Sequence, residues 1–369
     1  MLKTLNEIYS PVLKLMKLFG SYYGHTDLKQ LEHMAAGKHI FSKIYCGLMV
    51  SLIWLNVVMA FFGIFLSGSA YMFLMFALGQ VLIGICGITS VIVLPLTLKR
   101  KSRFEKFIRS LLANVKFINL NGVKKKSRKT FFVSCLVFLT NIAFCCVCDQ
   151  ILGLTIACCG PWNWWFGFRV FALISLFTGS VGWLLTVLFF YVTCLILEEC
   201  YDGLYKRMSS LPPLSEDFLS LKMEHHKLSE VVELADKMLS PFLLGIISIY
   251  MPLLCISYYN TFILTEGTDS ITLAITSCWC LIAATFLLLV LYSASKVSEK
   301  IHSFQRILPR LPVSRSEEGK VGMLMFLLDL QGEPKGLSVG GLVVITKSMS
   351  LTIVGVTVSY FAVMLSLPR

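Results

Sequence analysis

Long apolar stretches alternate with polar and basic segments along most of this chain. A helix needs about 20 apolar residues to cross roughly 30 Å of bilayer hydrocarbon. Seven stretches have that length, at about 44–66, 71–98, 131–148, 170–197, 241–263, 271–295 and 348–367. The pattern therefore predicts an all-α membrane protein with seven transmembrane helices.

Two of the polar segments carry helical patterns of their own. Residues 214–240 repeat apolar side chains at three- and four-residue spacing, which is typical of an amphipathic helix. The repeating residues are Leu219, Met223, Leu228, Val231, Leu234 and Leu239. Residues 317–332, "EEGKVGMLMFLLDLQG", predict a short helix before the last span. We expect these helices to form a helical lobe below the membrane domain and to pack against partners.

The composition agrees with a membrane protein. Hydrophobic residues make up 56% of the chain and charged residues 15%, and the mean hydropathy is +0.76. Soluble domains are about 45–50% apolar and about 25% charged. The chain has 13 cysteines, most of them inside apolar runs, where free cysteine acts as a small hydrophobe and builds no disulfide framework. Cys148, Cys158 and Cys159 are the three placed for an outer-loop disulfide, and the sequence leaves that pairing open.

Basic residues are distributed very unevenly between the two sides of the predicted membrane domain. With Lys347 at a span edge left aside, the segments on the N-terminal side hold 30 Lys and Arg residues, and the opposite side holds Arg169 and Arg369. Loops rich in Lys and Arg stay in the cytoplasm, so we expect a cytoplasmic N-terminus and an extracellular C-terminus. The net charge of +12 is then a topology signal and does not indicate nucleic-acid binding.

This orientation divides the chain into three regions. Residues 1–43 form a cytoplasmic amphipathic segment that lacks the apolar core of a removable signal peptide. Residues 44–295 form a six-helix membrane bundle, with cytoplasmic helical extensions at about 198–240. Residues 296–369 contain the cytoplasmic short helix and the seventh span, 348–367.

The sequence carries no signature of an enzyme, a cofactor site or a metal site. It has no GxxxxGK, HExxH or paired CxxC motif, and no carboxylate lies within a predicted span to relay protons or ions. His225 and His226 are adjacent, so they point about 100° apart on a helix and cannot face one metal. We expect both on the polar face of the 214–240 helix.

Two other classes of membrane protein fit poorly. A rhodopsin-like receptor would have the opposite orientation, and the chain has neither a D-R-Y triplet after its third span nor N-P-x-x-Y in its seventh. Secondary transporters are commonly built on internal repeats, and none is visible in these seven spans.

The last third of the chain resembles insect-type gustatory and odorant receptors. The stretch "FLLDLQGEPKGLSVGGLVVITKSMSLTIVGVTVSYFAVMLSL" is similar to their C-terminal region, and "HHKLSEVVELADKMLSPFLL" is similar to the gustatory-receptor segment that leads into the fifth span. The last helix of the family ends in a Thr/Ser-Tyr pair, five apolar residues, Gln and an apolar residue. Ser359 and Tyr360 match the pair, whereas Ser366 and Leu367 stand at the final two positions, so Ser replaces the Gln.

This resemblance implies a function and an assembly. It implies a ligand-gated, nonselective cation channel in the plasma membrane, gustatory-receptor-like rather than olfactory. Four identical or related subunits would surround a central pore, each giving its seventh helix to the pore wall, and the cytoplasmic lobe would join them. No enzyme activity and no cofactor are expected.

The seventh span carries a stripe of residues suited to a pore. Five residues follow each other at steps of four, three, four and three, which places them on one helix face: Thr352, Val356, Ser359, Val363 and Ser366. Apolar rings can exclude water and ions, so Val363, at the gate position that the resemblance implies, is the predicted gate. Lys347 precedes the span and is expected to reach the cytoplasmic interface. Glu266 and Asp269 outside would enrich cations near the mouth.

An uncharged small molecule is the expected ligand, because the outer halves of the second to sixth spans offer aromatic faces and a few polar groups but no charge. The candidate contacts are Tyr71, Gln80, Asn141, Phe171, Tyr259, Asn260 and Trp279.

Three alternatives remain open at the level of sequence. The departure from Gln at Ser366 allows a non-conducting structural or trafficking protein of the same fold, and a small-solute transporter is a further alternative. Ser359 and Ser366 would also be explained by hydrogen bonds to carbonyls of their own helix or by helix packing.

Overall fold

The computed structural model describes residues 1–22, 26, 28, 40–66, 87, 103–114, 120–152, 166–210, 217–263, 270–308 and 317–366. Helices occupy six of the seven predicted spans: α2 (Ile40–Leu66), α6 (Asn121–Leu152), α8 (Phe166–Ser209), α9 (Asp217–Ile263), α10 (Ser270–His302) and α12 (Lys347–Ser366). Apart from Gly87, the span predicted at 71–98 lies outside the described residues, as do Cys158 and Cys159.

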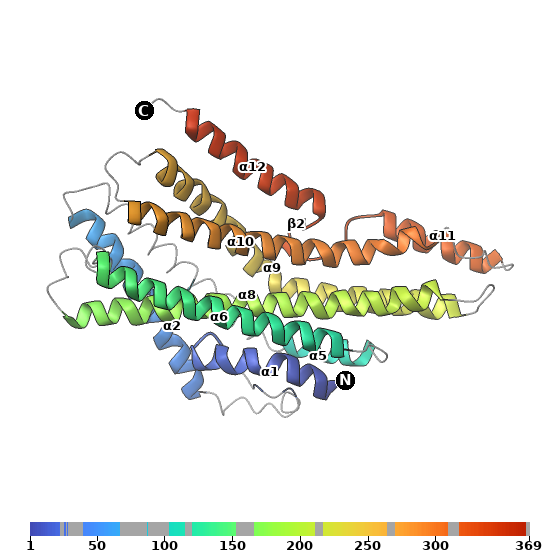
Figure 1. The fold of residues 1–369 in the computed structure, drawn as a ribbon. Helices are drawn as coiled ribbons and strands as arrows, with labels where there is room; N and C mark the ends of the chain where they lie inside the picture. Colours follow the sequence, from blue (N-terminus) through green and yellow to red (C-terminus); the bar gives the residue numbers. More distant parts are fainter. Residues whose placement is uncertain are drawn as a thin grey trace.

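The smaller elements lie between and before these helices. They are α1 (Leu2–Leu18), α5 (Arg103–Asn114), the 3-10 helix η4 (Ser303–Arg306), α11 (Glu317–Gln331) and the antiparallel strands β1 (Ser338–Val339) and β2 (Val343–Val344). The short helix predicted at 317–332 is thus confirmed as α11. Figure 1 shows an elongated bundle in which the helices run along the long axis.

Two helices are much longer than a bilayer is thick. At about 1.5 Å per residue, the 44 residues of α8 and the 47 residues of α9 extend over roughly 66 Å and 70 Å, about twice the hydrocarbon thickness. The membrane-length apolar part of α8 therefore continues without a break into its polar end. In the described part of the chain, two helical segments are long and apolar enough to cross a membrane, Phe177–Ser209 and Cys280–Arg306.

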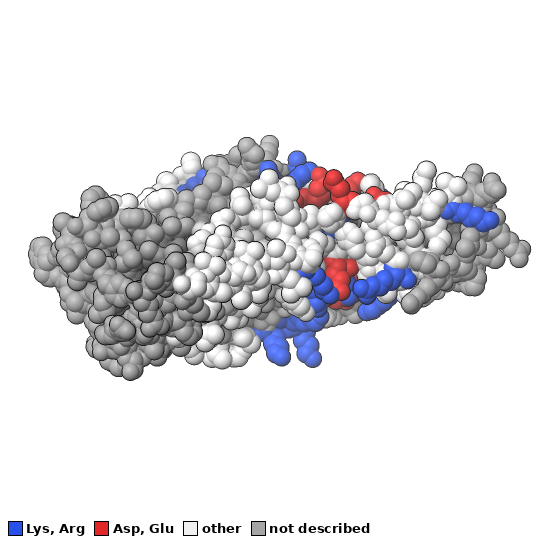
Figure 2. Space-filling model, turned by 90° about the horizontal axis from the view of Figure 1, so that it is seen from above, with Lys and Arg blue, Asp and Glu red and all other residues white. Residues whose placement is uncertain are grey.

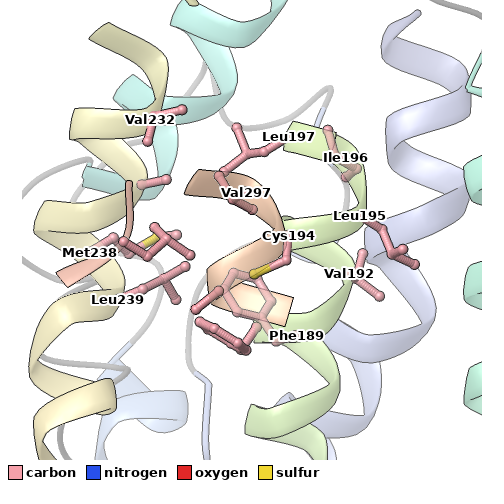
Figure 3. Close-up of a cluster of buried hydrophobic side chains, with 14 of the residues drawn as sticks. Phe189, Val192, Cys194, Leu195, Ile196, Leu197, Val232, Met238, Leu239 and Val297 are labelled. Carbon is pink, nitrogen blue, oxygen red and sulfur yellow. The ribbon is translucent and has the colours of Figure 1, made fainter. Parts of the chain in front are cut away.

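Helix α8 lies at the centre of the bundle, in contact with α1, α2, α6, α9 and α10. Figure 3 shows Leu239 of α9 and Val297 of α10 directed toward Phe189 and Cys194 of α8. Phe189, Leu239 and Val297 are fully buried. Close van der Waals packing of this kind along α8 holds the bundle together.

Helix α1 is part of this core. Its buried residues recur at three- and four-residue spacing and form one face: Leu5, Ile8, Tyr9, Val12, Leu13 and Met16. The hydroxyl groups of Tyr9 and Thr193 lie 3.1 Å apart, so the buried phenol is hydrogen-bonded to α8. The amphipathic N-terminal segment therefore packs through its apolar face onto the bundle.

Charged side chains are concentrated along part of the bundle. On the face that Figure 2 shows, most of the described charged residues lie between the middle of the molecule and the end that carries α11. At the middle, the Nζ atom of Lys296 lies 3.4 Å from an oxygen of Glu198, and that of Lys300 lies 2.5 Å from Asp202. These pairs join α8 to α10 just beyond their apolar parts.

Candidate functional site

The last helix begins with a well-defined cap. The amide of Met349 donates to Oγ1 of Thr346 over 3.2 Å, which satisfies one of the free donors at the first turn of α12. Lys347 pairs with Glu299 of α10 through Nζ and Oε1, 2.7 Å apart. The Lys347 side chain is 63% exposed. The base of α12 is therefore fixed to α10 by a surface ion pair and carries no buried charge.

A small hairpin attaches the same base to α9. The Ser338 hydroxyl and the Asp236 carboxylate lie 2.8 Å apart, and the Ser338 amide donates to Oδ1 of Asp236 over 2.5 Å. Burial raises the pKa of the Asp236 carboxyl above its ordinary value, and the two hydrogen bonds from Ser338 partly offset that effect. We call Asp236 and the β1–β2 hairpin, residues 338–344, the hairpin clamp.

The hairpin approaches α9 very closely. Gly340 has a φ of +63°, its amide donates to the Ser240 carbonyl over 2.9 Å, and a Cβ atom on it would lie 3.0 Å from Leu244. A side chain at position 340 would therefore be strained both by its backbone conformation and by its neighbour.

A proline in α9, next to the hairpin contact at Ser240, provides an attachment point for another helix. Pro241 has no amide hydrogen, so the Lys237 carbonyl loses the helical hydrogen bond that residue 241 would otherwise donate. The guanidinium of Arg103 from α5 donates to that carbonyl. The break in the helical hydrogen bonds thus becomes an attachment point for α5.

The predicted pore stripe lies on the exposed side of α12. Ile353 and Thr357 are buried, with 6% and 8% exposure, on a helix whose contacts within the chain include α9 and α10. All five residues of the stripe are exposed: Thr352, Val356, Ser359, Val363 and Ser366. Figure 1 shows α12 at the edge of the bundle, beside α10. The stripe therefore lies outside the face of α12 that packs within the chain, on the flank next to it.

Two of the three hydroxyl groups of the stripe, those of Thr352 and Ser366, also bond within their own helix. Ser366 donates to the Val363 carbonyl over 2.7 Å, and Thr352 donates to the Ser348 carbonyl over 3.0 Å. These bonds use the donor hydrogen of each hydroxyl, while the oxygen keeps acceptor capacity toward the exposed side. Tyr360 of the family motif is 58% exposed, and Leu367 lies outside the described residues.

One predicted ligand contact, Phe171, lines a hollow of about 300 Å³ between α2 and α8. The other lining residues are Met49, Leu52, Ile53, Val170, Ile174 and Thr178. Thr178 donates its hydroxyl hydrogen to the Ile174 carbonyl over 2.7 Å, so the wall is almost entirely apolar. The volume is at the lower end of the range for small-molecule sites.

The remaining predicted contacts are outside the described side chains. Tyr71 and Gln80 lie outside the described residues, and the side chains of the other four are not described: Asn141 in α6, Tyr259 and Asn260 in α9, and Trp279 in α10.

An aromatic group between α8, α9 and α10 was missed at the level of sequence. The Trp183 ring stacks on Tyr250 with centroids 5.5 Å apart and meets the edge of Phe286 at 4.1 Å. Its buried Nε1 has no hydrogen-bond partner among the described residues. A tryptophan in the middle of an apolar span was the available signal. The indole N–H is a donor that an oxygen-containing ligand would satisfy.

The expectation for His225 is wrong. His225 is 1% exposed, and its ring meets those of Tyr201, Phe304 and Phe326 edge-on at 5.6, 4.9 and 5.0 Å. Phe304 and Phe326 belong to η4 and α11, which cover this side of α9. Desolvation by burial lowers the pKa of His225 to about 4, so the ring is neutral. His226 is exposed, as expected, and lies 3.7 Å from Glu230.

The described residues contain no group of three or more His, Cys, Asp or Glu side chains that could hold a metal ion. Among the cysteines whose side chains the structure describes, five are free thiols: Cys46, Cys135, Cys194, Cys200 and Cys255.

Comparison with known proteins relates most of this chain to a described family. The family described as "7tm Chemosensory receptor" matches residues 9–365. The structure is similar to that of the insect olfactory receptor OR5 from Machilis hrabei, with 16% sequence identity, 97% of each chain covered and a TM-score of 0.67. The same receptor in complex with eugenol gives 14% identity, 97% coverage of each chain and a TM-score of 0.63. No curated protein sequence matches the chain.

Proposed function

We propose that this chain, which belongs to the seven-transmembrane chemosensory receptor family, is one subunit of a ligand-gated, nonselective cation channel. The observation that carries the proposal is the exposure of the predicted pore stripe on α12. Thr352, Val356 and Val363 are exposed on a face of α12 that adjoins the face of the buried Ile353 and Thr357. A pore on a symmetry axis needs such a face on one helix of each subunit.

The proposed assembly has four subunits. Val356 is 37% exposed and Val363 is 59% exposed. In the assembly, their face would line the water-filled pore, next to the same helix of the other subunits around the axis. Val363 would form the narrowest ring, because a ring of apolar side chains excludes water and ions without closing completely. We place the N-terminus in the cytoplasm and the C-terminus outside, in the plasma membrane, from the distribution of Lys and Arg.

The proposed ligand is a neutral small molecule, and the receptor is gustatory-like. The apolar hollow at Phe171 supports a ligand with an apolar body. The indole N–H of Trp183, which has no hydrogen-bond partner among the described residues, does not line that hollow and marks a second candidate position for a ligand with a hydrogen-bond acceptor. The similar olfactory receptor structure in complex with eugenol is compatible with this ligand chemistry.

The hairpin clamp gives the proposed gating a mechanical connection. Trp183 and Tyr250 pack α8 against α9, and Asp236 joins α9 to the hairpin that leads into α12. A ligand that changes the packing of α8 on α9 would act on the base of α12 through this connection.

Recording from cells that express the chain tests the gate. Val363→Ala should raise the resting cation current several-fold, because a smaller apolar ring excludes water less effectively. Val358→Ala is the matched control, since Val358 is also 59% exposed but lies outside the stripe. Equal resting currents in both variants, at equal surface expression, would contradict the proposed gate.

Ser366 supports a second candidate function, a non-conducting structural or trafficking protein of the same fold. Ser stands here where the resemblance implies Gln, and its hydroxyl donates to the Val363 carbonyl. Under this alternative, neither the parent chain nor Val363→Ala conducts, although both reach the cell surface. A Ser366→Gln variant that alters permeability ratios would instead support the channel.

A further inference from the structure

Six basic residues gather where the start of α6 meets the N-terminal end of α1. They are Lys3, Lys124, Lys125, Lys126, Arg128 and Lys129, which we call the basic cluster. Helices α1 and α6 are in contact, and Figure 1 shows the N-terminus beside the start of α6. Lys124 forms an ion pair with Glu7 of α1. It is the only member in an ion pair within the described part of the chain.

Glu7 shows how closely the cations of the two helices approach each other. The hydrogen bond from Lys124 lowers the pKa of the Glu7 carboxyl, and the charges of Lys124, Lys3 and Arg128 lower it further. One carboxylate is therefore shared by cations from both helices. Five of the six positive charges have no carboxylate in an ion pair in the described part of the chain.

This arrangement is unfavourable for an isolated protein. Cations near a helix N-terminus oppose the helix dipole, and like charges four residues apart, such as Lys125 and Lys129, repel each other. Val123 and Ser127 are buried on the inner face of α6, whereas Lys125 and Lys129 are exposed on the outer face. The repulsion falls if an anionic surface lies against that outer face.

The same outer face becomes apolar within one helical turn. After Lys129 come Phe132, 70% exposed, and Val133, 47% exposed, and then Leu136 and Leu139, 53% and 61% exposed. A change from basic to apolar along one exposed face matches the change from phosphate to acyl chain at the edge of a bilayer. A soluble polyanion would match the basic part alone.

We propose that the basic cluster binds the phosphate groups of anionic phospholipids, with the exposed apolar residues of α6 against their acyl chains. The site joins α1 to α6 through the lipid as well as through the protein. It depends on membrane embedding and not on conduction, so it can be tested even on a chain that forms no channel.

The test uses the purified full chain in mixed micelles, with thermal unfolding as the readout. Phosphatidylserine and phosphatidylinositol bisphosphate should raise the unfolding midpoint, and phosphatidylcholine at equal concentration should not. In the triple variant Lys125→Gln, Lys126→Gln and Lys129→Gln, the concentration of anionic lipid needed for half the shift should rise about tenfold or more. The matched control, Lys206→Gln, Lys227→Gln and Lys320→Gln, removes three exposed lysines elsewhere and should keep the shift.

Three results would overturn the proposal. They are an equal shift with phosphatidylcholine, an unchanged shift in the Lys125 triple variant, and a full shift with soluble inositol phosphate that lipid does not exceed. If the triple variant does not fold, the single variant Lys126→Gln and the parent chain at high salt replace it. Both should weaken the effect of anionic lipid, because salt screens exposed charges, and an unchanged effect in both would overturn the proposal.

Discussion

At the scale of single residues, burial decides what His225 can do. The adjacent residue His226 has the same side chain and lies in the same helix, yet it is exposed and lies near Glu230. His225 instead lies among Tyr201, Phe304 and Phe326, where a charged imidazolium would lose its hydration without gaining a partner for Nε2. Its neutral form therefore belongs to the folded state.

This difference predicts a pH dependence of stability. An unfolded histidine takes up a proton below a pH of about 6.5, whereas His225 in the folded chain does so only near a pH of about 4. The neutral ring therefore contributes fully to the free energy of unfolding above pH 6.5. This contribution, roughly 3 kcal/mol in all, is lost as the pH falls toward 4. Thermal unfolding of the purified chain between pH 7.5 and pH 5 should show this decline.

Substitution separates this effect from other titrations. His225→Phe preserves an aromatic ring that carries no charge, so it should flatten the decline between pH 6.5 and pH 5. His226→Phe is the control and should leave the slope unchanged, because that side chain is exposed. Equal slopes in the parent and in both variants would show that His225 does not carry the effect.

At the scale of elements, the hairpin clamp connects parts of the chain that are 102 residues apart in sequence. The strands have only two residues each, so they bury too little surface to be stable by themselves. Their position depends on Asp236 and on the Gly340 amide, which donates to α9. Because the hairpin leads into α12, these bonds also fix the position of the base of α12.

Removing the carboxylate should therefore loosen the base of α12. Asp236→Ala leaves the amide and hydroxyl of the buried Ser338 without their acceptor, which should cost about 1–3 kcal/mol of unfolding free energy. Asp236→Asn keeps one acceptor oxygen and should cost less. Glu233→Ala is the control, because Glu233 is 63% exposed and pairs with Lys237, which is also exposed. Denaturant or thermal unfolding of the three variants measures how much stability each one loses. A loss of unfolding free energy in Glu233→Ala as large as that in Asp236→Ala would contradict the prediction.

The elements differ in how far they follow from sequence. Apolar length located α2, α6, α8, α9, α10 and α12, because hydrocarbon thickness sets a minimum that few other segments meet. The three- and four-residue repeat also predicted the start of α9, where Leu228 and Val231 are buried while Leu219 and Met223 are 60% and 54% exposed. That difference depends on which neighbours reach each turn, and periodicity alone does not contain it.

The site was predictable where it depends on helix geometry and unpredictable where it depends on distant contacts. A shared helix face followed directly from the spacing of Thr352, Val356 and Val363. The bonds between Asp236 and Ser338 did not follow, because hydrogen bonding between distant segments has no sequence period. The Gly-Gly pair at residues 340–341 was a readable hairpin signal, since both residues have positive φ.

At the scale of the whole molecule, long helices join an apolar half to a charged half. Helices α8 and α9 each continue from one into the other, and pairs such as Lys300 with Asp202 lie where the apolar part ends. A displacement of these helices in the membrane would therefore be transmitted to the lobe that holds the hairpin clamp and α11.

This arrangement predicts an orientation in the membrane. An epitope placed after Arg369 should be labelled on intact cells, and an epitope before Met1 should be labelled only after permeabilisation, because the proposed topology keeps the basic segments in the cytoplasm. Labelling in the reverse order would contradict the proposed topology and, with it, the outer position of Val363.

A cysteine scan of residues 352–366 tests the central claim, that α12 lines a pore, most directly. Each position is changed singly to cysteine, a water-soluble thiol reagent is applied during current recording, and the parent chain controls for the 13 native cysteines. The account predicts that modification blocks current at positions 352, 356, 359, 363 and 366 and leaves it unchanged at the buried positions 353 and 357. Equal protection at all positions would show that this helix lines no pore.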